Sequence, residues 1–485
     1  MKLKELMGSI CYQRIQGNIE VDISHLSYNS KHIQPGTLFF CIKGFQTDGH
    51  QYAIDAVQKG AIALIVEDSI SNIPEDITVL QVDNTRKVMS LISTNFYNHP
   101  ASKMNIIGVT GTNGKTTITF LIDAIIKEAG RKTGVIGTIH NKIGDKVVPS
   151  ERTTPESIDL QKLFAQMESE KVDDIIMEVS SHSLALDRVA GCHFKVGVFT
   201  NLTLDHLDFH KTMDQYKAAK AKLFQHSEYA VINADDSVAE YIIKSSNGKV
   251  LTYGIDKDAD LIAYDLQITA DGVSFNIDID NEKRNFYLNI PGKFSVYNGL
   301  AAIGTCLCLG IPPSIIQEGL KKVNNVPGRF QTISSPVGYR IIVDYAHAPD
   351  GLENILKTVQ EFKTGRIITV FGCGGNRDKS KRPIMGKIAG TYSDFCVLTS
   401  DNPRSEEPLQ ILDEIEVGIQ KTDCPYTKIV DRKKGIIFAL EEARAEDIVI
   451  IAGKGHEKYQ IFDQGQKIHF DDVEIVEEYI QEESM

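Results

Sequence analysis

The chain has 485 residues, of which 42% are hydrophobic and 24% are charged, a composition typical of soluble globular proteins. This length predicts about three domains, each large enough to bury its own core. The net charge of −13 argues against broad binding to nucleic acid or anionic membranes, and no apolar run is long enough to span a membrane. Because the first residues also lack the apolar core of a secretion signal, we expect a cytoplasmic protein.

The first predicted domain, residues 1–98, is small and of the α/β class. A Pro-Gly turn at 35–36 precedes a predicted strand at 37–42. A helical stretch follows at 52–59, and a second apolar strand is expected at 61–66.

The second predicted domain, residues 99–329, begins with a strand at 104–110, a glycine-rich loop and a helix. Apolar residues recur every three or four positions in that helix until Gly130 ends it. Two more strands end at Met177 and Thr200, and a strand-rich stretch near 250–290 precedes a helix at 291–310. The segment "NNVPGRF" then breaks the pattern, which places the next boundary near 330.

The third predicted domain, residues 330–485, alternates strands with helices. The strands lie in "RIIVDYAHAPD", "RIITVFGCGGNRD", "FCVLTSDNPR" and "DIVIIAGKGHE". This alternation predicts a mostly parallel, doubly wound (Rossmann-like) sheet, so the whole chain is expected to be α/β.

The glycine-rich loop "GVTGTNGKTT" at 108–117 has the context of a phosphate-binding loop, between a strand and a helix. The generic pattern needs a glycine where Val109 stands, so the fit rests on the remaining glycines, the Lys-Thr pair and the helix. Lys115 is expected to reach the outer phosphates of a nucleotide, and the Thr116 hydroxyl to bind magnesium. The expected nucleotide contacts are Gly111, Thr112, Asn113, Gly114, Lys115, Thr116 and Thr117.

Several residues near this loop are candidate magnesium ligands, each with a structural alternative. Glu178 ends an apolar strand, where a carboxylate can bind magnesium, although it could instead cap a helix or face solvent. His206 lies among acidic residues and histidines, where a purely structural histidine is the alternative. Lys217, Lys220 and Lys222 share a predicted helix and could form only a solvated basic face.

Arg404 follows the turn "SDNP", in which Pro403 restricts the backbone. It is either a solvated loop charge or a guanidinium held to recognise a carboxylate at two points. Ligands of parallel sheets bind beyond the carboxyl ends of the strands, where several polar residues of this domain are expected to converge. They are Arg377, Asp401, Asn402, Pro403, Arg404, Gly453 and Glu457.

The order of these motifs resembles that of the muramyl peptide ligase family, and within it the ligases that add diaminopimelate. The motifs are "TGTNGKTT", "TTP", "MEVSSH", "NLTLDHLDFH", "AAKAKLF", "DYAHAPD", "FGCGGNRDKSKRP", "DNPR" and "AGKGHE", and the resemblance covers nearly the whole chain. It implies a uridine-nucleotide domain, a central ATPase domain and an amino-acid domain. It also implies that ATP activates the D-glutamyl γ-carboxylate of UDP-N-acetylmuramoyl-L-alanyl-D-glutamate as an acyl phosphate, which the amine of meso-diaminopimelate attacks. The product serves cytoplasmic peptidoglycan synthesis, and hence cell shape and division, and we expect the enzyme to be a monomer.

The same resemblance implies roles for individual residues. Lys115 is expected to act on the transferred phosphate, while Thr116, Glu178, His206 and Lys220, the last as a carbamate, would bind magnesium (Mg²⁺). The residues expected to contact ATP are Asn298, Arg329 and Asp344. Those expected to contact the uridine nucleotide and muramyl peptide are Ser30, Thr47, Thr153, Thr154, Ser180 and Arg188. Two positions depart from the family's usual pattern, with Ser295 in place of Asn and Leu186 in place of Gln.

The cysteines are scattered and show none of the paired spacings of zinc sites. We expect reduced thiols, no disulfides and no essential cysteine. The positions are Cys11, Cys41, Cys192, Cys306, Cys308, Cys373, Cys396 and Cys424.

Two other functions stay open at this point. A folylpolyglutamate-type or cyanophycin-type ligase would share the phosphate loop but is not expected to carry both "DNPR" and "GKGHE". A regulatory P-loop ATPase would leave the charged strand ends of the last domain unexplained. ATP consumption that requires both a UDP-sugar peptide and an amino acid would separate the peptide ligase from a switch protein.

Overall fold

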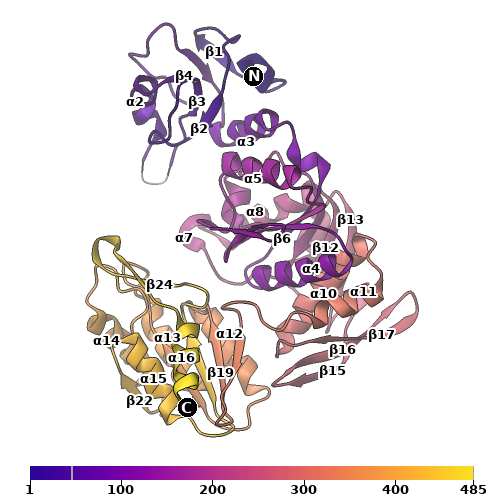
Figure 1. Ribbon diagram of the computed structural model, residues 1–485, viewed down its shortest axis with the longest axis vertical. Coiled ribbons are helices and arrows are strands. Elements are labelled where there is room, and N and C mark those ends of the chain that lie inside the picture. Colours follow the sequence, from indigo (N-terminus) through magenta and orange to yellow (C-terminus); the bar gives the residue numbers. More distant parts are fainter. Residues whose placement is uncertain (45–46, 484–485) are drawn as a thin grey trace. The chain divides into compact units, whose positions relative to one another are not determined.

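The computed structural model describes residues 1–44 and 47–483 (Figure 1). The chain divides into two compact units, one of residues 1–253 with 304–311 and the other of residues 254–303 with the chain from 312 onward. Each unit is described separately below. The predicted domain boundaries at 98/99 and 329/330 stay a prediction.

The first unit begins with a five-stranded sheet in the order β1-β5-β4-β3-β2. Strands β2 to β5 are parallel, and β1 joins the edge of β5 in the antiparallel sense. The predicted strand at 61–66 is confirmed, whereas β1 escaped prediction because it is short and mostly exposed. The elements are α1 (Leu3–Met7), β1 (Gln13–Gln16), β2 (His25–Ser27), β3 (Thr37–Phe40), a 3₁₀ turn (Gly49–Tyr52), α2 (Ala53–Gln58), β4 (Ala61–Val66), β5 (Thr78–Gln81) and α3 (Thr85–Phe96).

The second sheet of this unit carries the glycine-rich loop. Its strands in the first unit follow the order β13-β12-β11-β6-β10-β7-β8-β9, and the neighbouring pairs are parallel except for β7-β8 and β8-β9. They are β6 (Asn105–Thr110), β7 (Thr133–Ile136), β8 (Asn141–Ile143), β9 (Lys146–Val148), β10 (Asp174–Glu178), β11 (Phe194–Phe199), β12 (Ser227–Asn233) and β13 (Lys249–Gly254).

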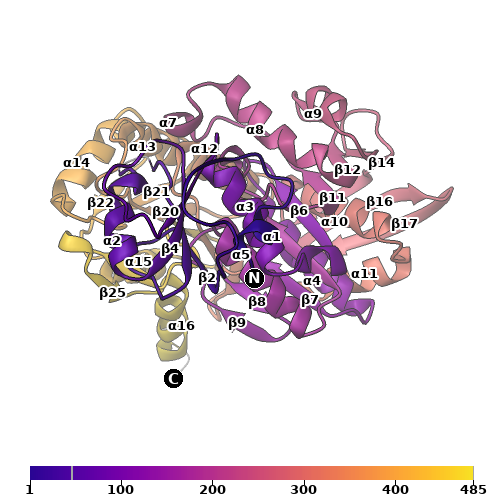
Figure 2. The same cartoon turned by 90° about the horizontal axis from the view of Figure 1, so that it is seen from above.

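Helices cover both faces of this sheet. Apolar side chains of α5 and α8 pack on one face together with Ile106, Ile175 and Met177, and α4 lies on the opposite face (Figures 1 and 2). Strand β6 lies between β10 and β11, so the loop after β6 emerges at the centre of the sheet. The helices are α4 (Lys115–Glu128), α5 (Ser157–Ser169), α6 (Ser181–Ala185), α7 (Leu207–His210), α8 (Met213–Gln225) and α9 (Ala239–Ser245), with a 3₁₀ turn at Pro100–Lys103.

The second unit begins with a small antiparallel sheet in the order β15-β16-β17. The strand-rich stretch and the helix predicted after it are therefore confirmed. The elements are β14 (Leu261–Ile262), β15 (Tyr264–Thr269), β16 (Gly272–Ile279), β17 (Glu282–Leu288), α10 (Lys293–Cys308), whose last residues from 304 belong to the first unit, and α11 (Pro313–Lys321).

The last sheet has the order β18-β19-β23-β20-β21-β22, with only the edge strand β18 antiparallel. Helices α15 and α16 pack on one face, while α12, α13 and α14 form a second helical layer, which confirms the doubly wound prediction. The strands are β18 (Gln331–Ser334), β19 (Arg340–Asp344), β20 (Ile367–Phe371), β21 (Phe395–Leu398), β22 (Tyr426–Lys428) and β23 (Ile448–Ala452). The helices are α12 (Pro349–Gln360), α13 (Lys381–Tyr392), α14 (Pro408–Ile419), α15 (Arg432–Glu442) and α16 (Asp472–Glu483), and a hairpin pairs β24 (Tyr459–Ile461) with β25 (Lys467–His469).

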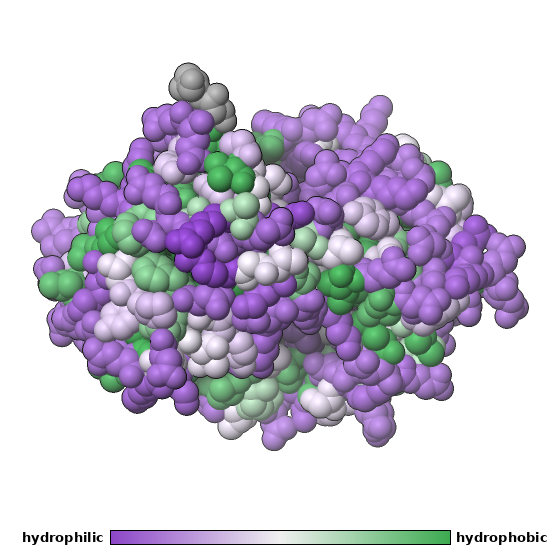
Figure 3. Space-filling model, turned by 90° about the horizontal axis from the view of Figure 1, so that it is seen from below, coloured by the Kyte–Doolittle hydropathy of each residue, from purple (hydrophilic) through white to green (hydrophobic). Residues whose placement is uncertain are grey.

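On the face that Figure 3 draws, hydrophobic residues are interspersed among hydrophilic ones. Within the described part of the chain, none of the helices combines the length and the apolar character that crossing a membrane requires.

Candidate active site

The glycine-rich loop joins β6 to α4, and its backbone conformation requires glycine. Gly111 and Gly114 have φ angles of 152° and 88°, in the region that other residues rarely adopt. A Cβ atom on Gly111 would lie 1.8 Å from Oγ1 of Thr200, the residue after β11, so a side chain there would also displace that residue. The loop can therefore bring backbone N–H groups close to a phosphate, as the sequence predicts.

Lys115 folds back over this loop. Its ammonium group donates to the carbonyl oxygens of Gly111 at 2.9 Å and of Thr112 at 2.8 Å. These contacts hold a positive charge above the loop, where the outer phosphates of a nucleotide are expected.

Glu178 lies at the end of β10, beside Val109 of β6, and is only 1% exposed. Its carboxylate accepts hydrogen bonds from the Thr116 hydroxyl at 3.0 Å and from the backbone N–H of Thr138 at 2.8 Å. The Thr138 hydroxyl donates to its second oxygen at 3.0 Å. Glu178 is therefore neither exposed nor a helix cap, and the oxygen-rich donor set of Thr116 and Glu178 fits magnesium.

Four predicted substrate contacts lie around Glu178. Thr154 donates through its hydroxyl to the Glu178 carbonyl at 2.8 Å and accepts from the Ser180 N–H at 3.0 Å. The Thr153 and Thr138 hydroxyls are 3.0 Å apart. Arg188 donates to the Thr154 carbonyl at 3.0 Å. The structure thus brings Thr153, Thr154, Ser180 and Arg188 together near the carboxyl end of β10 in the central sheet.

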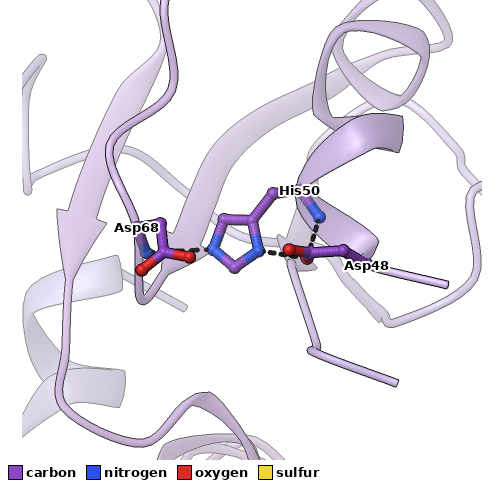
Figure 4. A group of neighbouring side chains, drawn as sticks. All are labelled: Asp48, His50 and Asp68. Carbon is purple, nitrogen blue, oxygen red and sulfur yellow. Dashed lines mark hydrogen bonds and ion pairs between the residues drawn. The ribbon is translucent and has the colours of Figure 1, made fainter. Parts of the chain in front are cut away.

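Ser30 and Thr47 lie instead on loops of the five-stranded sheet. The segment that follows Thr47 is held by His50, whose Nδ1 lies 2.6 Å from Asp48 Oδ1 (Figure 4). The Nε2 of His50 accepts from the backbone N–H groups of Glu67 at 3.0 Å and Asp68 at 3.2 Å. Because both ring nitrogens are engaged, His50 joins two segments and is a poor metal ligand, although Asp48, His50 and Asp68 lie together.

His206 belongs to a group of histidines that the sequence prediction did not recognise as a cluster. Its ring centroid lies 4.9 Å from that of His182, which lies 5.6 Å from that of His210. Burial lowers the pKa of all three, that of His210 to about 4, so neutral rings are favoured, as a metal ligand requires. His182 and His210 do lie inside the motifs "SSH" and "LDFH", which could have identified them.

Lys220 is the buried member of the three lysines on α8. It is 1% exposed, and its Nζ lies 4.6 Å from the centroid of the Tyr216 ring. Burial, and then the charge of Lys115, lowers its pKa well below that of a free lysine. Lys217 and Lys222 instead pair with Asp214 at 2.9 Å and Asp187 at 3.4 Å on a more exposed face. The solvated-face interpretation therefore suits those two lysines but not Lys220.

Arg329 and Asp344 lie together in the second unit. Asp344 ends β19, and its two oxygens accept from the N–H groups of Phe330 at 2.7 Å and Ala346 at 2.8 Å. Burial raises the pKa of Asp344, and the nearby Arg329 opposes that effect. The guanidinium of Arg329 stacks 4.9 Å from the centroid of the Tyr345 ring.

Asn298 is buried on α10, one turn beyond Phe294, whose ring lies 5.5 Å from that of Phe330. Ser295, which departs from the family pattern, donates its hydroxyl to the Pro291 carbonyl at 2.9 Å within the same helix start. Its hydrogen-bonding capacity is thus used locally. Leu186, the other departure, is the C-cap residue of α6.

Arg404 is anchored on both sides of its loop. Its backbone N–H donates to the Ile461 carbonyl at 3.0 Å, and its guanidinium donates to the Gly375 carbonyl at 2.7 Å. A Cβ atom on Gly374 would lie 2.9 Å from this guanidinium and 3.7 Å from Arg377 Cγ, so both arginines flank that glycine. Arg404 forms no ion pair with a carboxylate in the described part of the chain, which leaves its charge available to a ligand.

A fully buried lysine organises the neighbouring predicted contacts. Lys454 Nζ donates to Asn402 Oδ1 at 3.1 Å and to Glu457 Oε2 at 3.2 Å, and lies 3.7 Å from Asp401 Oδ1. The Asn402 amide then donates to Glu457 at 3.1 Å. Gly453, with φ of 121°, precedes this lysine. The sequence prediction named the residues on either side of Lys454 in "GKGHE" but missed Lys454 itself.

Models of three Mur ligase domains match the chain in order. The model described as "Mur ligase family, catalytic domain" matches residues 22–97, the "Mur ligase middle domain" matches 109–306 and the "Mur ligase, glutamate ligase domain" matches 328–455. A relative from Caldanaerobacter subterraneus subsp. tengcongensis is 49% identical over 99% of both chains. The chain belongs to the Mur ligase family.

That relative is named UDP-N-acetylmuramoyl-L-alanyl-D-glutamate--2,6-diaminopimelate ligase, as is a Clostridium botulinum protein 47% identical over 99% of this chain and 100% of its own. A solved structure of a ligase with the same name matches this Mur ligase with a TM-score of 0.73 at 33% identity. The match covers 100% of this chain and 99% of the other. The phosphate loop, Glu178 and Lys220 fall within the Mur ligase middle domain, and the "DNPR" loop falls within the glutamate ligase domain.

Proposed function

We propose that this Mur ligase adds meso-2,6-diaminopimelate to UDP-N-acetylmuramoyl-L-alanyl-D-glutamate at the expense of ATP. The observation that carries the proposal is full-length identity of 45–49% to relatives named for this reaction. The anchored but unpaired charge of Arg404 supports the choice of amino acid. The reaction belongs to cytoplasmic peptidoglycan precursor synthesis.

The first step transfers the γ-phosphoryl group of ATP to the D-glutamyl γ-carboxylate. A P–O bond to ADP breaks and one to the carboxylate oxygen forms, which gives an acyl phosphate and ADP. Lys115, held over the glycine-rich loop, stabilises the negative charge on the transferred group. Thr116, Glu178, His206 and Lys220 would hold magnesium, which when bound neutralises phosphate charge.

Lys220 fits this role only as a carbamate, because an ammonium would repel the metal. Its burial favours the neutral amine, and the neutral amine is the form that adds carbon dioxide. The added group turns a cationic side chain into an oxygen ligand.

The second step joins the amino acid. The neutral amine of diaminopimelate attacks the acyl carbon, phosphate leaves with its bonding electrons, and the amine loses a proton as the amide forms. This second step depends mainly on positioning, because the acyl phosphate is already activated.

Arg404 and the Lys454 network are suited to the distal end of meso-diaminopimelate, which carries a carboxylate and an amine. Arg404 would pair with the carboxylate, while Asp401, Asn402 and Glu457 would receive the amine. L-lysine lacks that carboxylate and would leave the half-buried guanidinium unpaired, at a cost of about 1–3 kcal/mol. We expect the enzyme to discriminate against lysine by at least about tenfold.

A phosphate-release assay with UDP-N-acetylmuramoyl-L-alanyl-D-glutamate, ATP and a panel of amino acids tests this function. We expect release that requires both the UDP-linked dipeptide and meso-diaminopimelate. Efficient use of L-lysine with diaminopimelate ignored would refute the specificity. ATP hydrolysis without either substrate would favour a switch ATPase. Phosphate release that instead requires glutamate and an added folate would favour a folylpolyglutamate-type ligase. Gel filtration of the active enzyme tests the expected monomer.

A further inference from the structure

Three arginines converge on one carboxylate in the first unit. Glu156, the N-cap residue of α5, is 4% exposed. Its Oε1 lies 2.5 Å from Arg152 Nη1 and 2.8 Å from Arg188 Nη2, and its Oε2 lies 3.4 Å from Arg86 Nη1. Arg188 was expected to contact the substrate, whereas Arg86 and Arg152 belong to no motif that the sequence prediction used.

The charges in this cluster do not balance. Three guanidinium groups face a single carboxylate, which leaves two positive charges without a partner inside the cluster. Two nearby acids have their own contacts, since Asp159 accepts from the Tyr28 hydroxyl at 2.7 Å and Asp187 pairs with Lys222 at 3.4 Å. In addition, the Arg188 side chain is only 11% exposed, and its Nε is buried without a hydrogen-bond partner. An anion would satisfy both the charge and this donor.

The cluster lies next to the phosphoryl-transfer residues. Arg188 donates to the Thr154 carbonyl at 3.0 Å, and Thr154 donates to the carbonyl of Glu178 at 2.8 Å. Arg86 reaches it from the first turn of α3, a helix that packs against α5. The arginines therefore lie between the elements of the five-stranded sheet and those of the central sheet, near the predicted magnesium ligand Glu178.

We propose that Arg86 and Arg152 join Arg188 in an anion subsite that binds an acidic oxygen group, phosphate or carboxylate, of the UDP-linked muramyl dipeptide. The proposal rests on the proposed function for the identity of the ligand. Arg188 and Arg86 are largely buried and define the subsite, and Arg152, 50% exposed, closes it from the solvent side. Guanidinium groups from separate segments can hold several oxygens of one anion at once.

Calorimetric titration with UDP-N-acetylmuramoyl-L-alanyl-D-glutamate, in the absence of ATP, tests the subsite in Arg86→Ala and Arg152→Ala. Each variant should bind about ten- to a hundredfold more weakly, and the Arg→Lys variants should retain part of the affinity. The affinity for ATP should not change. This measurement shows that each variant is folded, because an unfolded variant would also lose ATP binding. Arg14→Ala, which removes an exposed arginine from β1, is the matched control and should bind normally.

A second ligand identifies the acidic group. If UDP-N-acetylglucosamine, which has phosphates but no carboxylate, loses affinity in the same proportion, the subsite holds a phosphate; if only the dipeptide ligand does, it holds a carboxylate. Unchanged affinity of both variants for the dipeptide ligand, within about twofold, would overturn the subsite while leaving the proposed function intact. Failure of the unmodified protein to bind that ligand would instead refute the proposed function.

Discussion

The hydroxyl of Thr116 donates to the carboxylate of Glu178 at 3.0 Å, although 62 positions separate the two residues. The contact joins the first turn of α4 to the end of β10, so the nucleotide loop and the candidate metal carboxylate form one site. Substitutions around this pair should therefore affect chemistry more than stability.

Lys115→Ala should abolish phosphate release while the protein stays folded, because it removes the charge held over the phosphate loop. Lys162→Ala, on the exposed side of α5, is the control and should be fully active. Stopped and continuous phosphate assays measure the activity of the two variants, and circular dichroism shows whether they are folded. Near-normal turnover in Lys115→Ala would refute the phosphate-loop assignment.

Lys220→Ala should be nearly inactive and should recover part of its activity with formate or acetate, which can supply the missing carboxylate oxygens. Lys217→Ala, on the same helix but paired with Asp214 at the surface, should behave like the unmodified protein. Mass spectrometry of the intact protein under bicarbonate should detect the added carbamate mass only when Lys220 is present. Normal turnover of Lys220→Ala would show that this lysine is merely buried.

Arg404→Ala should raise the KM for meso-diaminopimelate by about ten- to a hundredfold, with little change in the KM for ATP. The loss reflects a charge-assisted pair with the distal carboxylate. Initial-rate measurements with each substrate varied in turn provide the check. An unchanged diaminopimelate KM would mean that the Arg404 side chain only braces its loop through the Gly375 carbonyl.

The stability of the protein should fall in mild acid because of His210. Burial lowers the pKa of His210 from 6.5 to about 4, helped by the charges of His182, His206 and Lys220. The unfolded chain takes up this proton near pH 6.5, whereas the folded protein resists it, so stability present above pH 6.5 is lost as the pH falls toward 4. The decrease in the urea midpoint from pH 7 to pH 5 should be smaller in His210→Gln than in the control His25→Gln, an exposed site. Equal decreases in the two variants would contradict the assignment.

Brief alkylation should modify Cys11, the exposed cysteine, and leave activity intact. Cys373 lies inside "FGCGGNRD", but burial raises the pKa of its thiol to about 12, which suppresses the reactive thiolate. Peptide mass mapping alongside the activity assay provides the test. Rapid inactivation that tracks Cys373 labelling would show that this buried thiol becomes accessible in solution.

The sequence by itself determined the local elements of this protein and its family. The apolar run at 61–66, the strand–glycine-loop–helix unit and the strand–helix alternation after 340 were all predicted, because periodicity and turn residues act over a few positions. The motif order also identified the muramyl peptide ligase family, which the matched domains confirm.

Only the tertiary structure decided which side chains are buried and paired. Lys217, Lys220 and Lys222 lie on one predicted helix, and the local sequence pattern offers nothing to distinguish them. In the structure, packing beside Tyr216 buries only Lys220 among them. Arg404 could not be distinguished from a solvated charge until the loop carrying Gly375 and the end of strand β24, which carries Ile461, were placed around it. Lys454 and the arginines around Glu156 were missed for the same reason: burial, pKa and charge balance depend on contacts between residues far apart in the chain, which local patterns do not contain.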